Sequence, residues 1–125
     1  MLNKKKSYVY LFILFISINS HCISWVSDYK TPGNTWNVAI SGNYAYVADD
    51  SGLHIINISN PSTPLLASSY YTSTRANDVA VLNDIAYVAT SFSGLLLIDV
   101  SNPATPSLLG RYDSTSNTYA VVVSG

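Results

Sequence analysis

The chain has 125 residues, 48% of them apolar, with a single cysteine and a formal net charge of −1. Half of the basic residues lie at 4–6, so the part after residue 24 carries three basic residues against seven aspartates, a net charge of −4. An acidic body with scattered cations lacks the basic stripe that neutralises phosphates, which excludes a nucleic-acid partner. One thiol excludes an internal disulfide framework.

Residues 1–24 have the three parts of a secretory signal peptide. These are a basic start at Lys4–Lys6, an apolar run from Tyr8 to Ile18, and a polar exit that ends at Ser24. The run is about half as long as the roughly 20 residues that a membrane-spanning helix needs. We therefore expect cleavage after Cys22 or Ser24, a secreted or cell-envelope location, and no transmembrane span in the mature chain.

Cys22 offers an alternative, because a cysteine after an apolar run can be lipidated as the first residue of a mature bacterial lipoprotein. Such signals carry small residues just before the cysteine, whereas this chain has the bulky His21. The sequence thus favours ordinary cleavage over lipidation.

The rest of the chain repeats itself with a period of 41 to 42 residues. Asn37–Ala48 aligns with Asp78–Ala89, and Gly52–Pro64 aligns with Gly94–Pro106. This period, filled with short β-type runs and turn residues, is typical of the blade of a β-propeller or a similar array. We predict an all-β fold, a partial propeller with about two four-stranded blades, at approximately 36–76 and 77–118.

Two further segments fit the same repeat. Ser24–Tyr29 aligns with the last strand of each repeat, which predicts a single N-terminal strand, and Tyr119–Gly125 aligns with Trp36–Gly42 as the start of a third blade. Closed propellers have about 4 to 8 blades, so we interpret the chain as part of a longer protein. The alternative is a complete two-blade protein that closes by self-association, which we also expect of the isolated fragment because its outer faces are uncovered.

Four strands are predicted in the second repeat: Asp78–Leu82, Ile85–Ala89, Leu95–Val100 and Ser107–Tyr112. Asn83-Asp84 suits a tight hairpin with positive φ. The third strand is almost wholly apolar, which indicates burial on both faces. The prolines at 103 and 106 then end the ladder, and Asn102 before proline favours a turn.

The segment Gly94–Pro103, preceded by Asp84–Ala89, resembles the LVIVD repeat of secreted or surface proteins of bacteria and archaea, which form β-propellers. The five namesake residues fall on 95–99 and, in the first repeat, on 53–57, where Asn57 replaces Asp99. The resemblance implies a scaffold rather than a catalytic residue set. Asp99 and Asn57 are expected to bond local backbone ahead of the Asn-Pro turns.

No catalytic group, metal site or cofactor emerges from the remaining candidates. His54 stands in a strand where the second repeat has Leu96, which favours a strand histidine over a member of a serine triad. Zinc would need at least three ligands. Asp49 and Asp50 could hold a hard cation, but an ordinary solvated turn ending in Gly52 is favoured.

The two repeats differ in the loops between strands two and three and in the links between blades. In a propeller these variable loops emerge on one face, and loops on a rigid scaffold often carry function. Six residues are candidates for this ligand face: Arg75, Phe92, Asp49, Asp50, Trp36 and Tyr119. The alternative is that the loops vary because nothing constrains them.

These observations favour a non-enzymatic extracellular or cell-surface module with an unknown protein or glycan partner. The alternative is a fragment of a propeller enzyme or sugar-binding protein whose active groups lie in blades that this chain lacks.

Overall fold

The computed structural model describes the backbone of residues 8–17 and 20–125 and the side chains from Ser27 onward. Residues 1–7 and 18–19, which belong to the predicted signal peptide, lie outside the described residues. Within the described ranges, no helix is long and apolar enough to cross a membrane.

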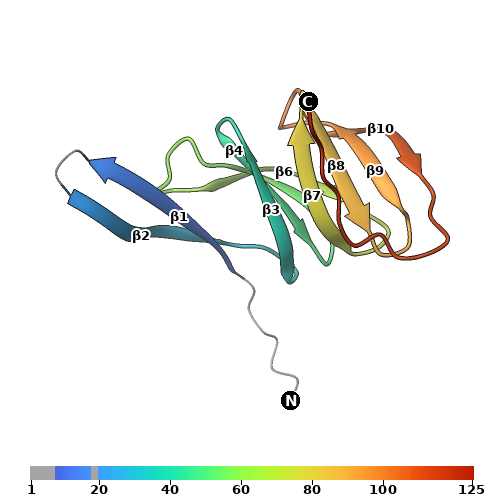
Figure 1. Ribbon diagram of the computed structural model, residues 1–125, viewed down its shortest axis with the longest axis horizontal. Helices are drawn as coiled ribbons and strands as arrows, with labels where there is room; N and C mark the ends of the chain where they lie inside the picture. The colour runs from blue at the N-terminus through green and yellow to red at the C-terminus, as the bar shows by residue number, and fades with distance from the viewer. Residues whose placement is uncertain (1–7, 18–19) are drawn as a thin grey trace, which may run out of the picture.

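Ten strands form three antiparallel sheets that follow one another along the chain (Figure 1). The first sheet pairs β1 (Tyr8–Ser17) with β2 (Ser20–Lys30). The second, which we call blade 1, has the order β3 (Thr35–Ser41), β4 (Tyr44–Asp49), β5 (Gly52–Asn57) and β6 (Leu65–Tyr71). Blade 2 consists of β7 (Ala76–Leu82), β8 (Ile85–Thr90), β9 (Leu95–Asp99) and β10 (Ser107–Tyr112).

The strands predicted for the second repeat are confirmed, each to within two residues. Asn83 and Asp84 have φ of 50° and 61°, the two positive values that a type I′ hairpin requires. Both four-stranded sheets are simple meanders in which each strand pairs with the next. The all-β fold with two four-stranded blades is therefore as predicted.

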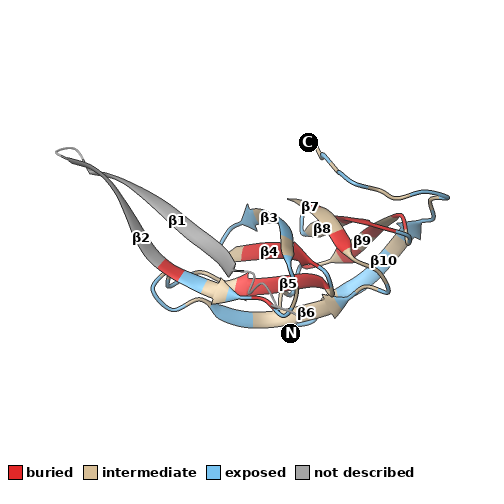
Figure 2. Cartoon of the chain, turned by 90° about the horizontal axis from the view of Figure 1, so that it is seen from below, coloured by how far each residue is buried: buried red, intermediate tan, exposed pale blue. Residues whose placement is uncertain are grey.

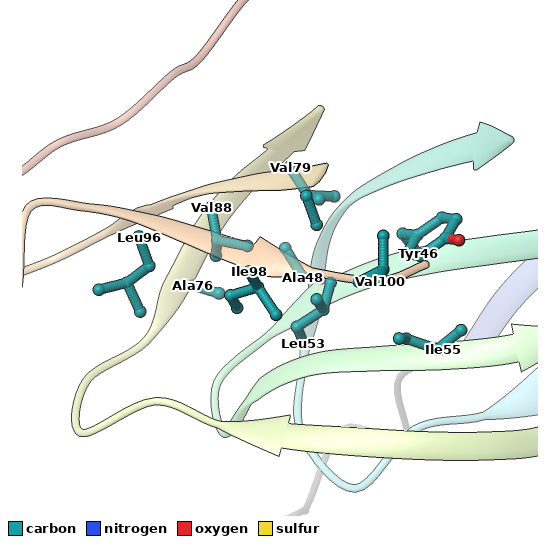
Figure 3. Close-up of a cluster of buried hydrophobic side chains, with 11 residues drawn as sticks. Tyr46, Ala48, Leu53, Ile55, Ala76, Val79, Val88, Leu96, Ile98 and Val100 are labelled. Atoms are coloured by element: carbon teal, nitrogen blue, oxygen red, sulfur yellow. The ribbon is translucent and has the colours of Figure 1, made fainter. Parts of the chain in front are cut away.

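The main core lies between the two blades (Figure 3). Alternate residues of β4 and β5 face blade 2, whose β7, β8 and β9 supply the opposing side chains. The buried members are Tyr46, Ala48, Leu53, Ile55, Ala76, Val79, Ala86, Val88, Leu96, Ile98 and Val100. The other face of blade 1 buries a smaller cluster of Ala45, Val47 and Ile56, packed against Tyr29 of β2.

Burial of the third strands reflects how many neighbours each blade has (Figure 2). In β5 the five residues from Gly52 to Ile56 are all buried, as predicted for a strand covered on both faces. In β9 burial alternates, because one face meets blade 1 and none of the described strands covers the other. The prediction of burial on both faces for the third strand of the second repeat is wrong for one face of β9, whereas β5 of the first repeat is buried on both faces.

The sheet before blade 1 carries the marks of a preceding blade's outer edge. The register of β2 on β1 skips Val26, as that of β6 on β5 skips Ala67 and that of β10 on β9 skips Leu109. These three bulges are one repeat apart. The segment predicted as the last strand of a blade is thus confirmed as a strand and has that strand's irregularity.

The single N-terminal strand predicted for the mature chain corresponds to β2, which in the full chain also pairs with β1. The run from Tyr8 to Ser17 consists mainly of aromatic and β-branched residues, which suit a strand as well as the apolar part of a signal. Among the described strands, β1 is the only one that pairs with β2, and this pairing satisfies backbone N–H and C=O groups that an unpaired edge would expose. Removal of a signal peptide would leave β2 unpaired.

The C-terminal segment is not assigned as a strand, although it aligns with the first strand of a blade. Thr118 N donates to the Thr90 carbonyl at 3.1 Å, and Val121 N donates to Asp78 Oδ2 at 2.9 Å. Gly125 lies beside Leu82, so the segment runs along β7 in the same direction. Among the described residues, the segment is held by these separate contacts rather than by the regular hydrogen bonds of a sheet.

Candidate functional site

The two kinds of loop lie at opposite ends of the blades. At one end, the turns after the first strands meet the loops after the third strands, through Ile58 N to the Asn43 carbonyl and Val100 N to the Asp84 carbonyl. At the other end, the inter-blade links meet the turns after the second strands, through Thr72 N to the Ser51 carbonyl and Ser91 N to the Arg75 carbonyl. We call the first the Asn-Pro end and the second the variable-loop end.

The Asn-Pro end is built the same way in both repeats. Asn57 Oδ1 accepts from Ser59 N at 2.9 Å, and Asp99 Oδ1 accepts from Ser101 N at 2.9 Å. The bonds from Ser101 lower the pKa of the exposed Asp99 carboxyl. The expectation that these side chains bond local backbone is confirmed.

The following turns repeat as well, since Asn60 Oδ1 accepts from Ser62 N at 3.2 Å and Asn102 Oδ1 accepts from Ala104 N at 3.1 Å. Such side-chain bonds are typical of Asx turns. This end is therefore a structural element whose hydrogen bonds repeat from one blade to the other.

At the variable-loop end, three of the predicted candidates form one cluster. The guanidinium carbon of Arg75 lies 4.3 Å from the centre of the Trp36 ring. Trp36 Nε1 donates to Asp50 Oδ1 at 2.7 Å, while Asp50 Oδ2 accepts from Asn34 N and Asn34 Nδ2. The cluster joins the first strand of blade 1 to the link that enters blade 2.

Arg75 is also fixed from its own blade, because its Nε donates to Asn77 Oδ1 at 2.7 Å. Stacking on Trp36 and this bond together orient the plane of the guanidinium. A cation over an aromatic face contributes about 0.5–1 kcal/mol at exposed sites. Arg75 is thus held in place before any ligand arrives.

Next to Arg75 lies an open hollow of about 490 Å³. Its lining residues come from the inter-blade link, the turn after β8 and the C-terminal segment: Thr74, Arg75, Ser91, Phe92 and Asn117. Phe92 is 74% exposed. Asn117 Oδ1 is shielded from solvent and has no hydrogen-bond partner among the described residues.

Tyr119 borders the hollow through one contact, since its hydroxyl oxygen accepts from Asn117 Nδ2 at 2.9 Å. Five of the six candidate residues thus lie on the exposed surface of this end or at the rim of its hollow. Sequence reasoning missed Thr74, Ser91 and Asn117, which have no distinctive pattern and are brought together only by the packing of successive blades.

A comparison with protein families matches the LVIVD repeat at residues 32–72 and 74–114, in agreement with the strands and bulges described above. The chain belongs to the LVIVD-repeat family. Comparisons with curated proteins and with solved structures found no match.

The namesake residues of the LVIVD repeat form β5 and β9. Leu53 and Ile55 face the core between the blades, while Ile56 belongs to the cluster on the opposite face. A strand that must fill both faces loses its polar alternation, which explains the apolar run of the motif.

Asp49 differs from its fellow candidates because its side chain is buried. Oδ1 accepts from Ser51 N, Ser51 Oγ and Gly52 N, and Oδ2 accepts from Gly33 N and contacts His54 Nε2 at 3.0 Å. The expectation of a solvated turn is therefore wrong for Asp49, although it holds for the exposed Asp50. No group of three metal-ligating side chains occurs among the described residues.

The second LVIVD repeat performs the same task with a different residue. Thr90, which occupies the position of Asp49, accepts from Ser93 N and donates to the Gly94 carbonyl. Both side chains organise the turn into the third strand. Burial by itself raises the pKa of Asp49, but the hydrogen bonds from His54 and its other donors outweigh burial and hold it far below the usual range.

His54 completes a chain of hydrogen bonds that sequence reasoning did not find. Its Nδ1 lies 2.7 Å from Ser69 Oγ, opposite it on β6, and its Nε2 contacts Asp49. The three residue types are those of a serine triad, but His54 is buried, with 1% of its surface exposed. The sequence held one signal for this network. Between the first and the second repeat, Asp49 is replaced by Thr90 and His54 is replaced by Leu96, so the two residues change together.

Proposed function

We propose that the chain is a non-enzymatic binding module, secreted or displayed at the cell surface, whose variable-loop end holds the partner. The two LVIVD blades act as a rigid support. Arg75, Trp36, Asp50 and Phe92 give this end its chemistry, and the Asn-Pro end serves the fold.

One observation carries the proposal, namely the exposed cluster of Trp36 and Arg75 beside Phe92. Aromatic and arginine side chains are the residues most enriched at binding hot spots. Large exposed aromatic rings cost solvation energy, and both rings lie at the end where the two repeats differ. A face kept only for stability has no need of such side chains.

Export is part of the proposal and rests on Lys4–Lys6 and the apolar run that follows. The enzyme alternative finds less support. Two of the three residues that resemble a triad, Asp49 and His54, are buried and bonded to each other, as expected of groups that organise a turn.

The test is a binding panel of extracellular polysaccharides and surface proteins, probed with the purified full chain. Arg75→Ala and Phe92→Ala are compared with Asn60→Ala and Asn102→Ala. We expect the first pair to weaken binding at least tenfold and the second pair to change only stability. Loss of binding in the Asn variants alone, with folding intact, would reverse the assignment of the ends.

A further inference from the structure

The hollow at the variable-loop end has the size of a small-molecule site. Its volume of about 490 Å³ falls within the range of roughly 300–1,000 Å³ that is usual for ligand pockets. It lies between Arg75, which enters blade 2, and Asn117, which occupies the equivalent position one repeat later. The chemistry of its ligand can be inferred from the groups that line it.

Arg75 brings a positive charge that no carboxylate neutralises. Within the part of the chain that the structure describes, the ion pairs join His54 to Asp49 and Arg111 to Asp113. Among the described residues, Arg75 makes its hydrogen bond through Nε, which leaves its terminal N–H groups available. An oriented guanidinium fork matches the two oxygens of a carboxylate.

Phe92 offers a ring face beside this charge. Its backbone N–H contacts Thr74 Oγ1 at 3.4 Å, which fixes the loop, while the ring itself stays exposed. An exposed aromatic face packs against the C–H face of a sugar ring and excludes water from it. A ligand with both a carboxylate and a ring would match these two side chains.

Hydroxyl groups are the third requirement. Asn117 lines the hollow, but its Nδ2 already donates to the Tyr119 hydroxyl and its Oδ1 is shielded from the solvent. The hydroxyls of Thr74 and Ser91 line the same hollow. A polyhydroxylated ligand supplies donors and acceptors to these two hydroxyls.

We propose that the hollow binds a hexuronic acid unit of an acidic polysaccharide. Its carboxylate pairs with Arg75, its ring lies on Phe92, and its hydroxyls bond Thr74 and Ser91. An acidic peptide has the carboxylate but not the ring with its hydroxyls. This inference rests on the proposed function, which places the binding surface at this end.

The test is calorimetric titration of the full chain with trigalacturonate, a neutral galactose trimer and triglutamate. We expect trigalacturonate to bind at least tenfold more tightly than either control, with affinity that falls as salt rises. Arg75→Gln and Arg75→Lys should each weaken binding at least tenfold, because both lose the planar fork. Arg111→Gln removes the same charge elsewhere and should leave affinity unchanged, with thermal unfolding recorded for every variant.

Three outcomes would overturn the inference. Equal binding of the neutral trimer would remove the role of the carboxylate, tighter binding of triglutamate would indicate an acidic peptide, and no binding of trigalacturonate would exclude the ligand class. None of these contradicts the proposed function, which fails only if the Arg75 and Phe92 variants retain binding to every partner found in the panel.

Discussion

The hydroxyl of Ser68 donates to the carbonyl oxygen of Pro103 at 2.5 Å and so ties the outer strand of blade 1 to a loop of blade 2. One repeat earlier, Ser27 of β2 makes the same bond to the Pro61 carbonyl at 2.5 Å. The two bonds show that β2 is stacked on blade 1 as β6 is stacked on blade 2. Blade stacking is thus repeated down to single hydrogen bonds.

Ser68→Ala should destabilise the chain by about 1 kcal/mol, because it leaves a partly buried carbonyl without its donor. Ser62→Ala is the matched control, since that exposed residue in the Asn-Pro loop of blade 1 uses only its backbone N–H. Urea unfolding measures both. Equal midpoints for the two variants would show that the bond adds nothing to stacking.

Gly94→Ala should destabilise by about 2–3 kcal/mol through overpacking. Gly94 has φ of 72°, and a Cβ placed there would lie 1.9 Å from the Tyr112 carbonyl oxygen. Gly110→Ala, in the strand opposite, meets nothing within 4 Å and should be nearly neutral. The same unfolding measurement compares them, and a stable Gly94→Ala protein would mean that the link after β10 does not pass beside this turn.

His54→Leu should destabilise by about 1–3 kcal/mol, because it removes a donor from the buried Asp49 carboxylate. The double variant Asp49→Thr/His54→Leu reproduces the pair found in the second repeat and should recover much of this loss. A double-mutant cycle on unfolding free energies gives the coupling. Additive losses would contradict the assignment of the two residues to one network.

The stability of blade 1 should fall at acidic pH. The pKa of Asp49 in the folded chain lies below its value in the unfolded chain, which is about 3.9. The ionised Asp49 side chain therefore adds its full share to the free energy of unfolding above the pKa of the unfolded chain. This share is lost as the pH falls from about 4 toward the pKa of the folded chain. Urea midpoints between pH 7 and 2 should decline more steeply for the natural chain than for Asp49→Asn, and parallel curves would contradict this.

The repeat made most of the fold predictable, because two aligned copies revealed the strands, the Asn83-Asp84 hairpin and the Asn-Pro turns. Two things escaped. The pairing of β1 depends on which edge is vacant, and the apolar run before Ser17 suits a signal or a strand equally well. Burial of Asp49 depends on donors from Gly33 and His54, which its position in a polar turn did not indicate.

Within the site, sequence comparison found the right loops but not the contacts. Arg75 and Trp36 belong to successive repeats, and their stacking follows from the rotation between blades. Periodicity gives the length of a blade but not that rotation. The same reason hid Asn117, which joins the hollow only because the C-terminal segment runs along β7.

The central claim is that the variable-loop end is the binding end, and amide NMR of the full chain during titration with trigalacturonate tests it most directly. We predict shift changes concentrated at Thr74, Ser91, Phe92 and Asn117, with residues 59–64 and 101–106 unmoved. Changes concentrated at those two Asn-Pro segments, with the four hollow residues unmoved, would contradict it.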